Sequence, residues 1–405
     1  MNRKDLILVV NVGSTSFKYK LFNMKQGICL AKGKVESVFH ETAKYTWQNG
    51  LYHGAEVIDA SAGYGPCVQR MIALLTDKTI GVISCLECIG AVGFKAVHAG
   101  RINYPVLVTE QLLREMEKYA FVAPAHNPPY IETMKTFASL MPGTPLAASF
   151  ETCFHRTISE PVSVYPFPEE YREKYGLRKY GFHGASHSYV AWKIPQVVGR
   201  EDLRIISCHL GGSSSLCAIR NGKSVDTTMG FSPQSGVPNN NRNGDLDVFA
   251  VLYLMEKEKL TPIQMREMLS KNSGLLGLSG ISGDMRVLKA SSDPRAELTI
   301  EHLVYCVKKY IGGFAAELNG VDLITFSGGI GENDSDLRRR ICEKMDYLGI
   351  QLDQQANCEA VGELPADGVE ISASDSKVKI MVLPTDEEWM IAMNTHSVIT
   401  QEEIE

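Results

Sequence analysis

Three glycine-rich turns carry small hydroxyl side chains and follow apolar, strand-like runs. They span residues 13–16, 211–215 and 327–333. Glycine lets backbone N–H groups approach a phosphate oxygen closely, and serine and threonine hydroxyls add further donors. None of the turns has the GxxxxGK[ST] pattern, and none has GxGxxG where a strand leads into a helix. Together they predict phosphate binding by a different kind of loop.

A polar, asparagine-rich segment at residues 234–245 carries Arg242. Its turn-forming composition predicts a loop. The forked guanidinium group of arginine matches a carboxylate or a phosphoryl group, to which it can donate two parallel hydrogen bonds. This loop is therefore a candidate for contact with a reacting anion.

The turns need strands and helices that fix their positions. Residues 6–11 and 17–22 read as two strands joined by the first turn, and residues 203–210 and 216–220 as two strands joined by the second. Two such hairpins, about 200 residues apart, indicate two similarly built halves. Other predicted elements are strands at 147–150, 223–227 and 323–326, and helices at 110–118, 130–140, 183–199 and 336–345.

Length and charge limit the class of protein. A chain of 405 residues is too long for one core, so two domains are expected. The net charge of -6 argues against nucleic acid or an anionic membrane as the main partner. No stretch approaches the roughly 18 apolar residues that span a bilayer. The start of the chain does not read as a signal peptide, so we expect no membrane partner and a cytoplasmic location.

The ten cysteines are scattered, mostly beside apolar residues, and read as small buried side chains. Cys85 and Cys88 form a lone CxxC pair. A zinc site of this type needs a second pair, so the sequence predicts neither a metal nor a redox role there. His183 and His187 are spaced to share a helix face, but no third metal ligand is near in sequence.

The combined motifs resemble those of one enzyme family. Residues 11–18 (NVGSTSFK) are similar to the first signature of acetate kinases, and residues 180–187 (YGFHGASH) to the second. On these two long signatures the chain is identified as a member of the acetate kinase family. Further segments that resemble the family, in the family's order, are 209–211, 224–231, 273–286, 326–333 and 384–388.

The resemblance implies an α/β fold. The family belongs with sugar kinases, actin and the heat-shock chaperone ATPases, which have two domains of duplicated ribonuclease H-like core and an interdomain cleft for ATP and substrate. We expect an N-terminal domain of residues 1–152, completed by residues 385–405, and a nucleotide-binding domain of residues 153–384. A homodimer is implied as well.

The resemblance also implies roles for particular residues. Arg242 is expected to contact the substrate and the transferring phosphoryl group, and His183 to hydrogen-bond that group in flight. The expected catalytic set is completed by a cation, an anion and a further histidine, which are Lys95, Glu151 and His126. Lys95 and Arg242 bind the carboxylate substrate, and an apolar pocket for its acyl tail is formed by Val97, Phe182 and Pro233.

ATP or ADP and Mg²⁺ are the implied cofactors. Asn11 and Glu387 are the expected metal-site residues, since Mg²⁺ needs few protein carboxylates beside phosphates and water. We expect Glu388 to be solvated, and likewise the arginine run 338–340. The residues expected to bind the nucleotide are Ser14, Ser16, Lys18, His209, Gly211, Gly212, Asp284, Arg286, Gly329, Gly331 and Asn333.

Several departures from the family pattern fall on expected site residues. Lys95 replaces an arginine and Glu151 replaces an aspartate, so both charges are kept while both side-chain lengths change. Gly212-Ser213 replaces Asn-Gly, residues 237–241 differ from the usual segment, and Arg101 stands at a usually acidic position. Such changes favour an altered substrate or phosphoryl donor.

The leading interpretation is reversible phosphoryl transfer from ATP to acetate, giving acetyl phosphate and ADP. Propionate, butyrate or another small carboxylate, and diphosphate as donor, stay open as alternatives. A sugar or polyol kinase would instead need Asp/Asn pairs that bind hydroxyl groups. A weakly catalytic, nucleotide-dependent binding protein is the rival of another class.

Overall fold

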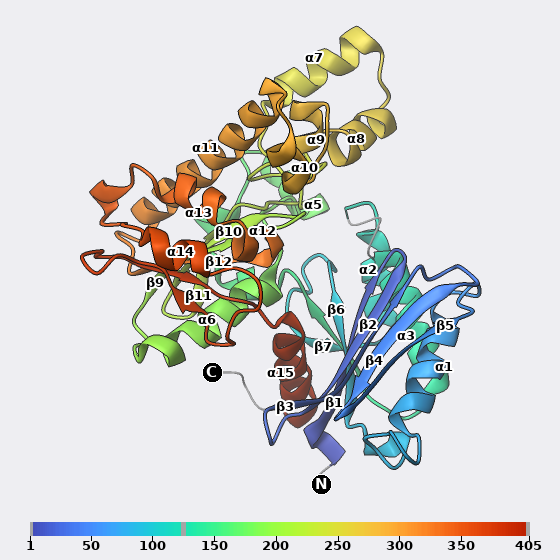
Figure 1. The fold of residues 1–405 in the computed structure, drawn as a ribbon. Helices are drawn as coiled ribbons and strands as arrows, with labels where there is room; N and C mark the ends of the chain where they lie inside the picture. The colour runs from blue at the N-terminus through green and yellow to red at the C-terminus, as the bar shows by residue number, and fades with distance from the viewer. Residues whose placement is uncertain (1–2, 123–126, 402–405) are drawn as a thin grey trace. The chain divides into compact units, whose positions relative to one another are not determined.

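The computed structural model describes residues 3–122 and 127–401 and divides into two compact units. Unit 1 comprises residues 1–153 and 386–405, and unit 2 comprises residues 154–385. The predicted domain boundaries lie one residue earlier at each junction, at 152 and 384 against 153 and 385. Each unit has its own mixed sheet and its own apolar core (Figure 1).

Unit 1 contains an eight-stranded sheet in the order β5-β4-β3-β2-β1-β6-β8-β7. Strands β1 to β5 are antiparallel to one another, whereas β6 is parallel to β1 and β8 is parallel to β6. The strands are β1 (Leu6–Gly13), β2 (Ser16–Asn23), β3 (Ile28–Glu36), β4 (Ala43–Asn49), β5 (Tyr52–Ile58), β6 (Ala91–Ala96), β7 (Val106–Leu107) and β8 (Leu146–Phe150).

Unit 2 contains a six-stranded sheet in the order β11-β10-β9-β12-β14-β13. Its strands are β9 (Arg204–His209), β10 (Ser215–Arg220), β11 (Lys223–Thr227), β12 (Leu323–Ser327), β13 (Val369–Glu370) and β14 (Lys379–Val382).

The two sheets share one topology. In unit 1 the order β3-β2-β1-β6-β8 joins three antiparallel strands to two parallel ones, and in unit 2 the order β11-β10-β9-β12-β14 does the same. A short antiparallel edge strand, β7 or β13, follows in both. The predicted α/β fold class is confirmed, and the duplication expected from the two hairpins is visible in strand order.

Helices cover both faces of the unit 1 sheet, which explains the continuous apolar run of β1. Helix α15, which follows unit 2 in the sequence, packs on β1, β6 and β8, while α3 packs on β1 and β6 (Figure 1). A Cβ atom at Gly93 would come within 2.1 Å of Thr395 Oγ1, so the close approach of α15 depends on that glycine. The helices of unit 1 are α1 (Tyr64–Leu75), α2 (Glu110–Lys118), α3 (Asn127–Leu140) and α15 (Glu387–Thr400), with 3-10 turns η1 (Arg3–Asp5) and η2 (Leu86–Cys88).

The longest of the described helices of unit 2 is α11, which begins with an Asp293 cap and a proline at its first position. These helices are α4 (Glu160–Ser163), α5 (Glu169–Tyr175), α6 (Gly184–Val198), α7 (Val248–Glu258), α8 (Pro262–Lys271), α9 (Gly274–Ser279), α10 (Met285–Ala290), α11 (Pro294–Glu317), α12 (Gly328–Asn333), α13 (Ser335–Cys342) and α14 (Gln354–Glu359), with 3-10 turns η3 (Cys153–Thr157), which crosses from unit 1, and η4 (Asp346–Leu348).

Helix α7 is apolar on every side over residues 248–255, yet none of its residues is buried. Phe249 is 75% exposed and Val248 is 66% exposed. The α7–α8 hairpin extends from the rest of unit 2 (Figure 1). Over the ranges 3–122 and 127–401, no helix is long and apolar enough to cross a membrane.

Candidate active site

The first glycine turn joins β1 to β2 in unit 1. Gly13 pairs with Ser16 across a two-residue turn, and Ser14 and Lys18 are exposed. Asn11, which lies in β1 two residues before Gly13, accepts a hydrogen bond of 2.9 Å from the Tyr130 hydroxyl. The same hydroxyl accepts one of 3.2 Å from the Val12 N–H. Tyr130 thus fixes the strand end beside the turn.

Lys95 lies near the end of β6, with its ammonium group between two carboxylates. Its Nζ atom is 2.8 Å from Glu151 Oε1 and also contacts Glu387 Oε2. Burial by itself would lower the pKa of Lys95, but the charges of Glu151 and Glu387 outweigh burial and hold that pKa well above its usual value. The structure therefore brings together three predicted site residues in unit 1.

The first turn of α15 adds a second ion-pair group. Asp386 caps the helix by accepting from Trp389 N, and Lys20 Nζ lies 2.9 Å from Asp386 Oδ1 and 3.2 Å from Glu388 Oε2. Asn11 Nδ2 donates to Glu388 Oε1 over 3.5 Å. The expectation that Glu388 is solvated is wrong, because its side chain is 20% exposed and carries these contacts. Acidic residues at a helix N-terminus are favoured by the helix dipole.

In unit 2 the second and third glycine turns meet. Leu210 N donates to Ser327 O, and Leu210 O accepts from both Ile330 N and Gly331 N. A Cβ atom at Gly211 would lie 3.8 Å from Gly329 N, and one at Gly328, where φ is +76°, would lie 2.7 Å from Leu210 O. Both turns therefore sit at the carboxyl ends of the neighbouring parallel strands β9 and β12, where α/β sheets bind ligands.

A chain of side-chain hydrogen bonds runs from Arg242 into the core of unit 2. Arg242 Nη2 donates to Ser213 Oγ, which lies 2.9 Å from His183 Nε2. His183 Nδ1 is 2.9 Å from Ser215 Oγ, and this hydroxyl is 2.8 Å from His187 Nε2. The chain ends at Ser207, whose Oγ atom is 2.9 Å from Nδ1 of the last histidine.

One direction of donation satisfies every group in this chain. Because Ser213 accepts from Arg242, its own proton is available to His183 Nε2, and His183 Nδ1–H then donates to Ser215. Burial and the neighbouring histidines keep the pKa of His187 well below its usual value, so His187 is neutral and can accept from Ser215. The chain orders both histidines in one tautomer.

His183 itself has backbone φ +55°, in the left-handed region, where it precedes α6. Its ring lies against that of His209, with centroids 4.5 Å apart, and His209 Nδ1 is 2.8 Å from Ser186 Oγ. A left-handed non-glycine residue costs conformational energy and is typical of functional positions. The hydrogen bonds to two serines hold His183 in this geometry.

The loop of Arg242 is fastened to the start of α9. Asn239 N donates to Arg242 O, Leu275 N donates to Asn239 O, and Ser273 N donates to Asn241 O. Asn239 Oδ1 accepts from Ser214 N, which ties the loop to the second glycine turn. Burial lowers the pKa of Arg242 to about 10, so the guanidinium stays charged at neutral pH.

The remaining residues that are predicted to bind the nucleotide do not belong to the hydrogen-bond series that starts at Arg242. Asp284 caps α10 and pairs with Arg286 at 2.6 Å, and the Arg286 side chain is 90% exposed. Gly329 is exposed and Gly331 is buried. Asn333 Nδ2 donates to Gly329 O over 3.0 Å, which is a hydrogen bond within α12.

The prediction that the run 338–340 is solvated is wrong for Arg338, which is fully buried. Its guanidinium donates to Gly331 O, Glu332 O and three acceptors on Asn357 and Ala360. The residue therefore clamps α13 and α14 to the end of α12. Burial lowers its pKa to about 10, which still leaves it charged.

The predicted acyl pocket is distributed over both units. Val97, half-buried, belongs to unit 1, whereas buried Phe182 and half-buried Pro233 belong to unit 2. His126 lies outside the described residues. The roles of these residues stay predictions.

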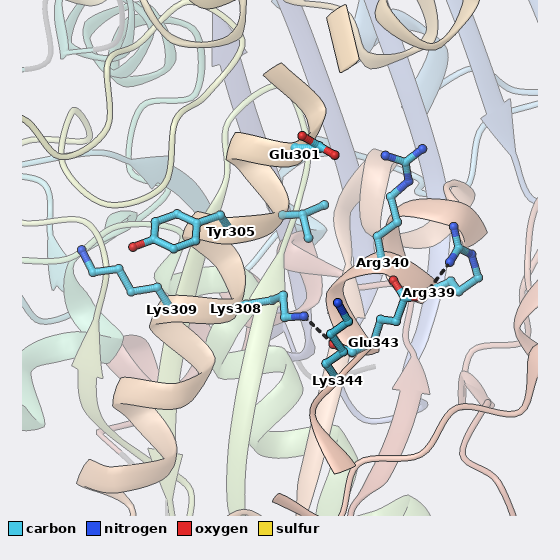
Figure 2. A pocket seen from close by; sticks show the side chains of 9 residues that line it. Glu301, Tyr305, Lys308, Lys309, Arg339, Arg340, Glu343 and Lys344 are labelled. Carbon is cyan, nitrogen blue, oxygen red and sulfur yellow. Dashed lines mark hydrogen bonds and ion pairs between the residues drawn. The ribbon is translucent and has the colours of Figure 1, made fainter. Parts of the chain in front are cut away.

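A groove of about 720 Å³ opens elsewhere in unit 2, between α11 and the end of α13 (Figure 2). Lys308 reaches across it to the main-chain oxygen of Glu343. Arg340 pairs with Glu297 and Asp336. The groove contains none of the predicted site residues, so its volume does not mark the site.

Sequence reasoning missed Tyr130, Ser213 and Asn239. In the sequence Ser213 stands out only as a departure from the family pattern, and the signal that could have identified it is a hydroxyl in the turn between the candidate histidine and the arginine loop. Nothing in the sequence pointed to Tyr130, whose contact with Asn11 joins residues 119 positions apart.

The fold and the paired turns define an α/β protein with glycine-rich loops at strand ends, and comparison with known proteins gives its family. The model of the acetokinase family matches residues 6–393. Acetate kinases of Caldanaerobacter subterraneus and Clostridium acetobutylicum are 40% and 41% identical to the chain over 400 residues, covering 97% of this chain and 98% of each relative.

Solved structures agree with this assignment. Porphyromonas gingivalis acetate kinase superposes with a TM-score of 0.86 at 35% identity, covering 97% of this chain and 99% of that one. A propionate kinase from Francisella tularensis gives 0.87 at 31% identity, with coverage of 97% and 100%. The chain belongs to the acetokinase family, and the predicted family is confirmed. It is thus a phosphotransferase with a carboxyl group as acceptor.

Proposed function

We propose that this enzyme transfers a phosphoryl group reversibly between ATP and acetate, forming acetyl phosphate and ADP. The observation that carries the proposal is the Arg242–Ser213–His183 chain beside the joined glycine turns of unit 2. It places an ordered cation and an ordered imidazole next to loops suited to phosphate. The acetate kinase relatives, matched over nearly their whole length, support acetate as the acceptor.

The proposed reaction is a direct in-line displacement. A carboxylate oxygen of acetate attacks the γ-phosphorus, a new P–O bond forms, and the bond to the β,γ-bridging oxygen breaks as ADP leaves. No general base is needed, because a carboxylate is ionised at neutral pH. Arg242 binds the carboxylate and stabilises the negative charge that develops on the phosphoryl group. His183 hydrogen-bonds an oxygen of that phosphoryl group.

The proposed nucleotide site is at the junction of the two turns in unit 2. Gly211, Gly212 and Gly329 lie beside the phosphates and the adenosine in this proposal, and buried Gly331, whose N–H and C=O bond to Leu210 and Arg338, supports their turn. The buried Ser327 Oγ at this junction has no hydrogen-bond partner among the described residues, which fits a site completed by a ligand. Ser14, Ser16 and Lys18 of unit 1 form the other phosphate loop in this proposal.

Mg²⁺ is the proposed metal, and bound to ATP it would neutralise phosphate charge. Asn11 and Glu387 are oxygen donors of the type this cation prefers, with water and phosphate completing its shell. Over the described ranges no group of three or more His, Cys, Asp or Glu side chains forms a metal site, which fits a metal brought mainly by the nucleotide. Lys95 and Glu151 position Glu387 in this proposal, since Lys95 contacts both carboxylates.

The test is a hydroxamate-trapping assay of the purified protein with Mg·ATP, across acetate, propionate, butyrate and more polar short acids, repeated with diphosphate. Acyl phosphate formed best from acetate and ATP is the expected result. Best activity with propionate would favour the function named for the Francisella relative. Nucleotide hydrolysis without any acyl product would overturn the proposal in favour of a nucleotide-dependent binding protein.

We propose in addition that two copies of the chain associate through α7. Six large apolar residues in and beside this helix are each at least half exposed, and together they expose on the order of 600 Å², close to the roughly 800 Å² that each partner buries in a stable interface. An all-apolar helix surface is normally buried. The six residues are Leu246, Val248, Phe249, Leu252, Tyr253 and Ile263.

We also propose that the enzyme has a cytoplasmic location.

A further inference from the structure

The sequence Ser84-Cys85-Leu86-Glu87-Cys88 forms a surface turn just before β6. Cys85 precedes the 3-10 turn η2 and Cys88 ends it. The two sulfur atoms are 3.3 Å apart. Cys85 is exposed and Cys88 is half-buried, so a reagent in solution can reach the pair. Nothing in the proposed kinase reaction uses these thiols.

The backbone of this turn suits a bond between the two side chains. Cys88 N donates to Cys85 O over 3.3 Å, so the residues occupy the ends of a hydrogen-bonded four-residue turn. In such a turn the end Cα atoms are less than about 7 Å apart, and disulfides span about 4.4–6.8 Å. The sulfurs need only side-chain rotation to move from contact to a bond of about 2.05 Å.

The two thiols differ in reactivity. Hydrogen bonds from Ser84, whose Oγ atom is 3.4 Å from Cys88 Sγ, and from Cys85 lower the pKa of Cys88. Hydrogen bonds with Cys88 and Glu87 raise the pKa of Cys85. The thiolate is the reactive form, so Cys88 attacks first and Cys85 acts second.

We infer that Cys85 and Cys88 are a reversible redox-modification site that forms an intrachain disulfide with low-molecular-weight disulfides as the oxidant. The Cys88 thiolate attacks one sulfur of oxidised glutathione and releases one glutathione thiolate. Cys85 then loses its proton and attacks the Cys88 sulfur of the mixed disulfide, which releases the second glutathione. Two protein thiols are oxidised, one small disulfide is reduced to two thiols, and the two protons pass to these products.

The other cysteines are weaker candidates for a redox site, and a metal site at the pair is a weaker explanation than the disulfide. Cys67, Cys153, Cys208, Cys217 and Cys342 are buried, as the sequence predicted. The prediction is wrong for exposed Cys29 and Cys358 and for half-buried Cys306. Within the described part of the chain no three metal-binding side chains gather, so a zinc site at the pair lacks ligands. The disulfide would tighten the turn that leads through buried Ile89 into β6.

The experiment treats the reduced full-length protein with oxidised glutathione at pH 7 under native conditions, followed by alkylation and peptide mass mapping. We expect one peptide containing both Cys85 and Cys88 to lose two hydrogen atoms, and dithiothreitol to reverse the loss. Cys85→Ser should instead retain glutathione on Cys88, and Cys358→Ser should behave as the wild type.

Rates supply an independent readout. In Cys85→Ser, the adduct at Cys88 should form at least about tenfold faster than that at exposed Cys358, and adding Ser84→Ala should slow it about threefold. Stable glutathione adducts on both cysteines of the wild-type protein, without a disulfide, would overturn the inference. Equal rates at Cys88 and Cys358 would overturn it as well.

Discussion

Lys95 Nζ lies 2.8 Å from Glu151 Oε1, and the same ammonium group contacts Glu387, so one lysine whose side chain is 17% exposed balances two carboxylates from different parts of unit 1. Acetate kinases usually have an arginine at the position of Lys95 and an aspartate at the position of Glu151. Here the shorter cation is matched by a longer acid. The two departures therefore read as one compensated change rather than two separate ones.

The first prediction follows from this pair. Lys95→Met should lower the free energy of unfolding of unit 1 by about 3 kcal/mol, because two carboxylates would be left without their cation. Urea unfolding, followed by fluorescence of Trp47 and Trp389, measures the loss. The exposed Lys135→Met is the matched control. If Lys95→Met/Glu151→Gln is as unstable as the sum of its single variants, the two side chains are not coupled.

A second prediction concerns Ser213, which accepts from Arg242 and contacts His183. Ser213→Ala should reduce kcat/KM for the carboxylate roughly tenfold, since one hydrogen bond to a charged group is lost. Ser213→Thr retains the hydroxyl and should stay within about twofold of the wild type. Steady-state kinetics with each acid measures both, and equal activity of the alanine and threonine variants would contradict a positioning role.

Arg242 gives the third prediction. Arg242→Ala should lower kcat by about 10³-fold, the range found for arginines that stabilise a transferring phosphoryl group. Binding of ATP, measured by calorimetry, should change little, because the proposed contact is to the moving group and the acceptor. Arg295→Ala, at an exposed ion pair, is the control. Equal losses in turnover and ATP affinity would refute the assigned role.

The pH dependence of stability follows from the buried histidines of unit 2. Burial lowers the pKa of His155 to about 4, while it is near 6.5 when the chain is unfolded. Below pH 6.5 the unfolded state binds a proton that the folded state refuses, so unit 2 loses stability as pH falls from about 6.5 to about 4, by roughly 3 kcal/mol from this residue.

The measurement is urea unfolding of a Trp47→Phe/Trp389→Phe variant, in which Trp192 alone reports on unit 2. Adding His155→Gln should flatten the decline between pH 6.5 and 4, whereas His302→Gln, at an exposed position, should leave it unchanged. A decline of the same steepness in all three proteins would show that His155 is not responsible.

The fifth prediction tests association through α7. Light scattering after size-exclusion chromatography should give a dimer for the wild type and a monomer for Phe249→Glu, since a buried charge without a partner disrupts an apolar interface. Tyr347→Glu, at an equally exposed site on η4, should remain dimeric. A wild-type protein that is monomeric at micromolar concentration would refute the proposal.

The sequence allowed the local parts of the fold to be predicted and missed the long-range ones. The first two glycine turns were predicted correctly because apolar strands and turn residues are adjacent in sequence, and helix α2 was predicted at its observed bounds. Residues 328–333, predicted as part of a third turn, instead form helix α12. Arg338 was placed in solvent because its neighbours Arg339 and Arg340 are charged. Its burial depends on acceptors on Asn357 and Ala360, which helix periodicity cannot reveal.

The same limit applies to the candidate site. Family motifs pointed to Arg242 and His183, but not to the hydroxyl of Ser213 between them. The Lys95–Glu151 contact joins β6 to the residue after β8, and the substitutions at both positions were the available signal. Only the structure shows that they meet.

The return of the chain to unit 1 has a consequence for synthesis on the ribosome. Helix α15 covers β1, β6 and β8, yet its residues are translated only after all of unit 2. One face of the first sheet must wait, uncovered, while all of unit 2 emerges and becomes able to fold. Unit 2 can thus mature before unit 1, and a nascent chain stalled before α15 would expose an apolar sheet to chaperones.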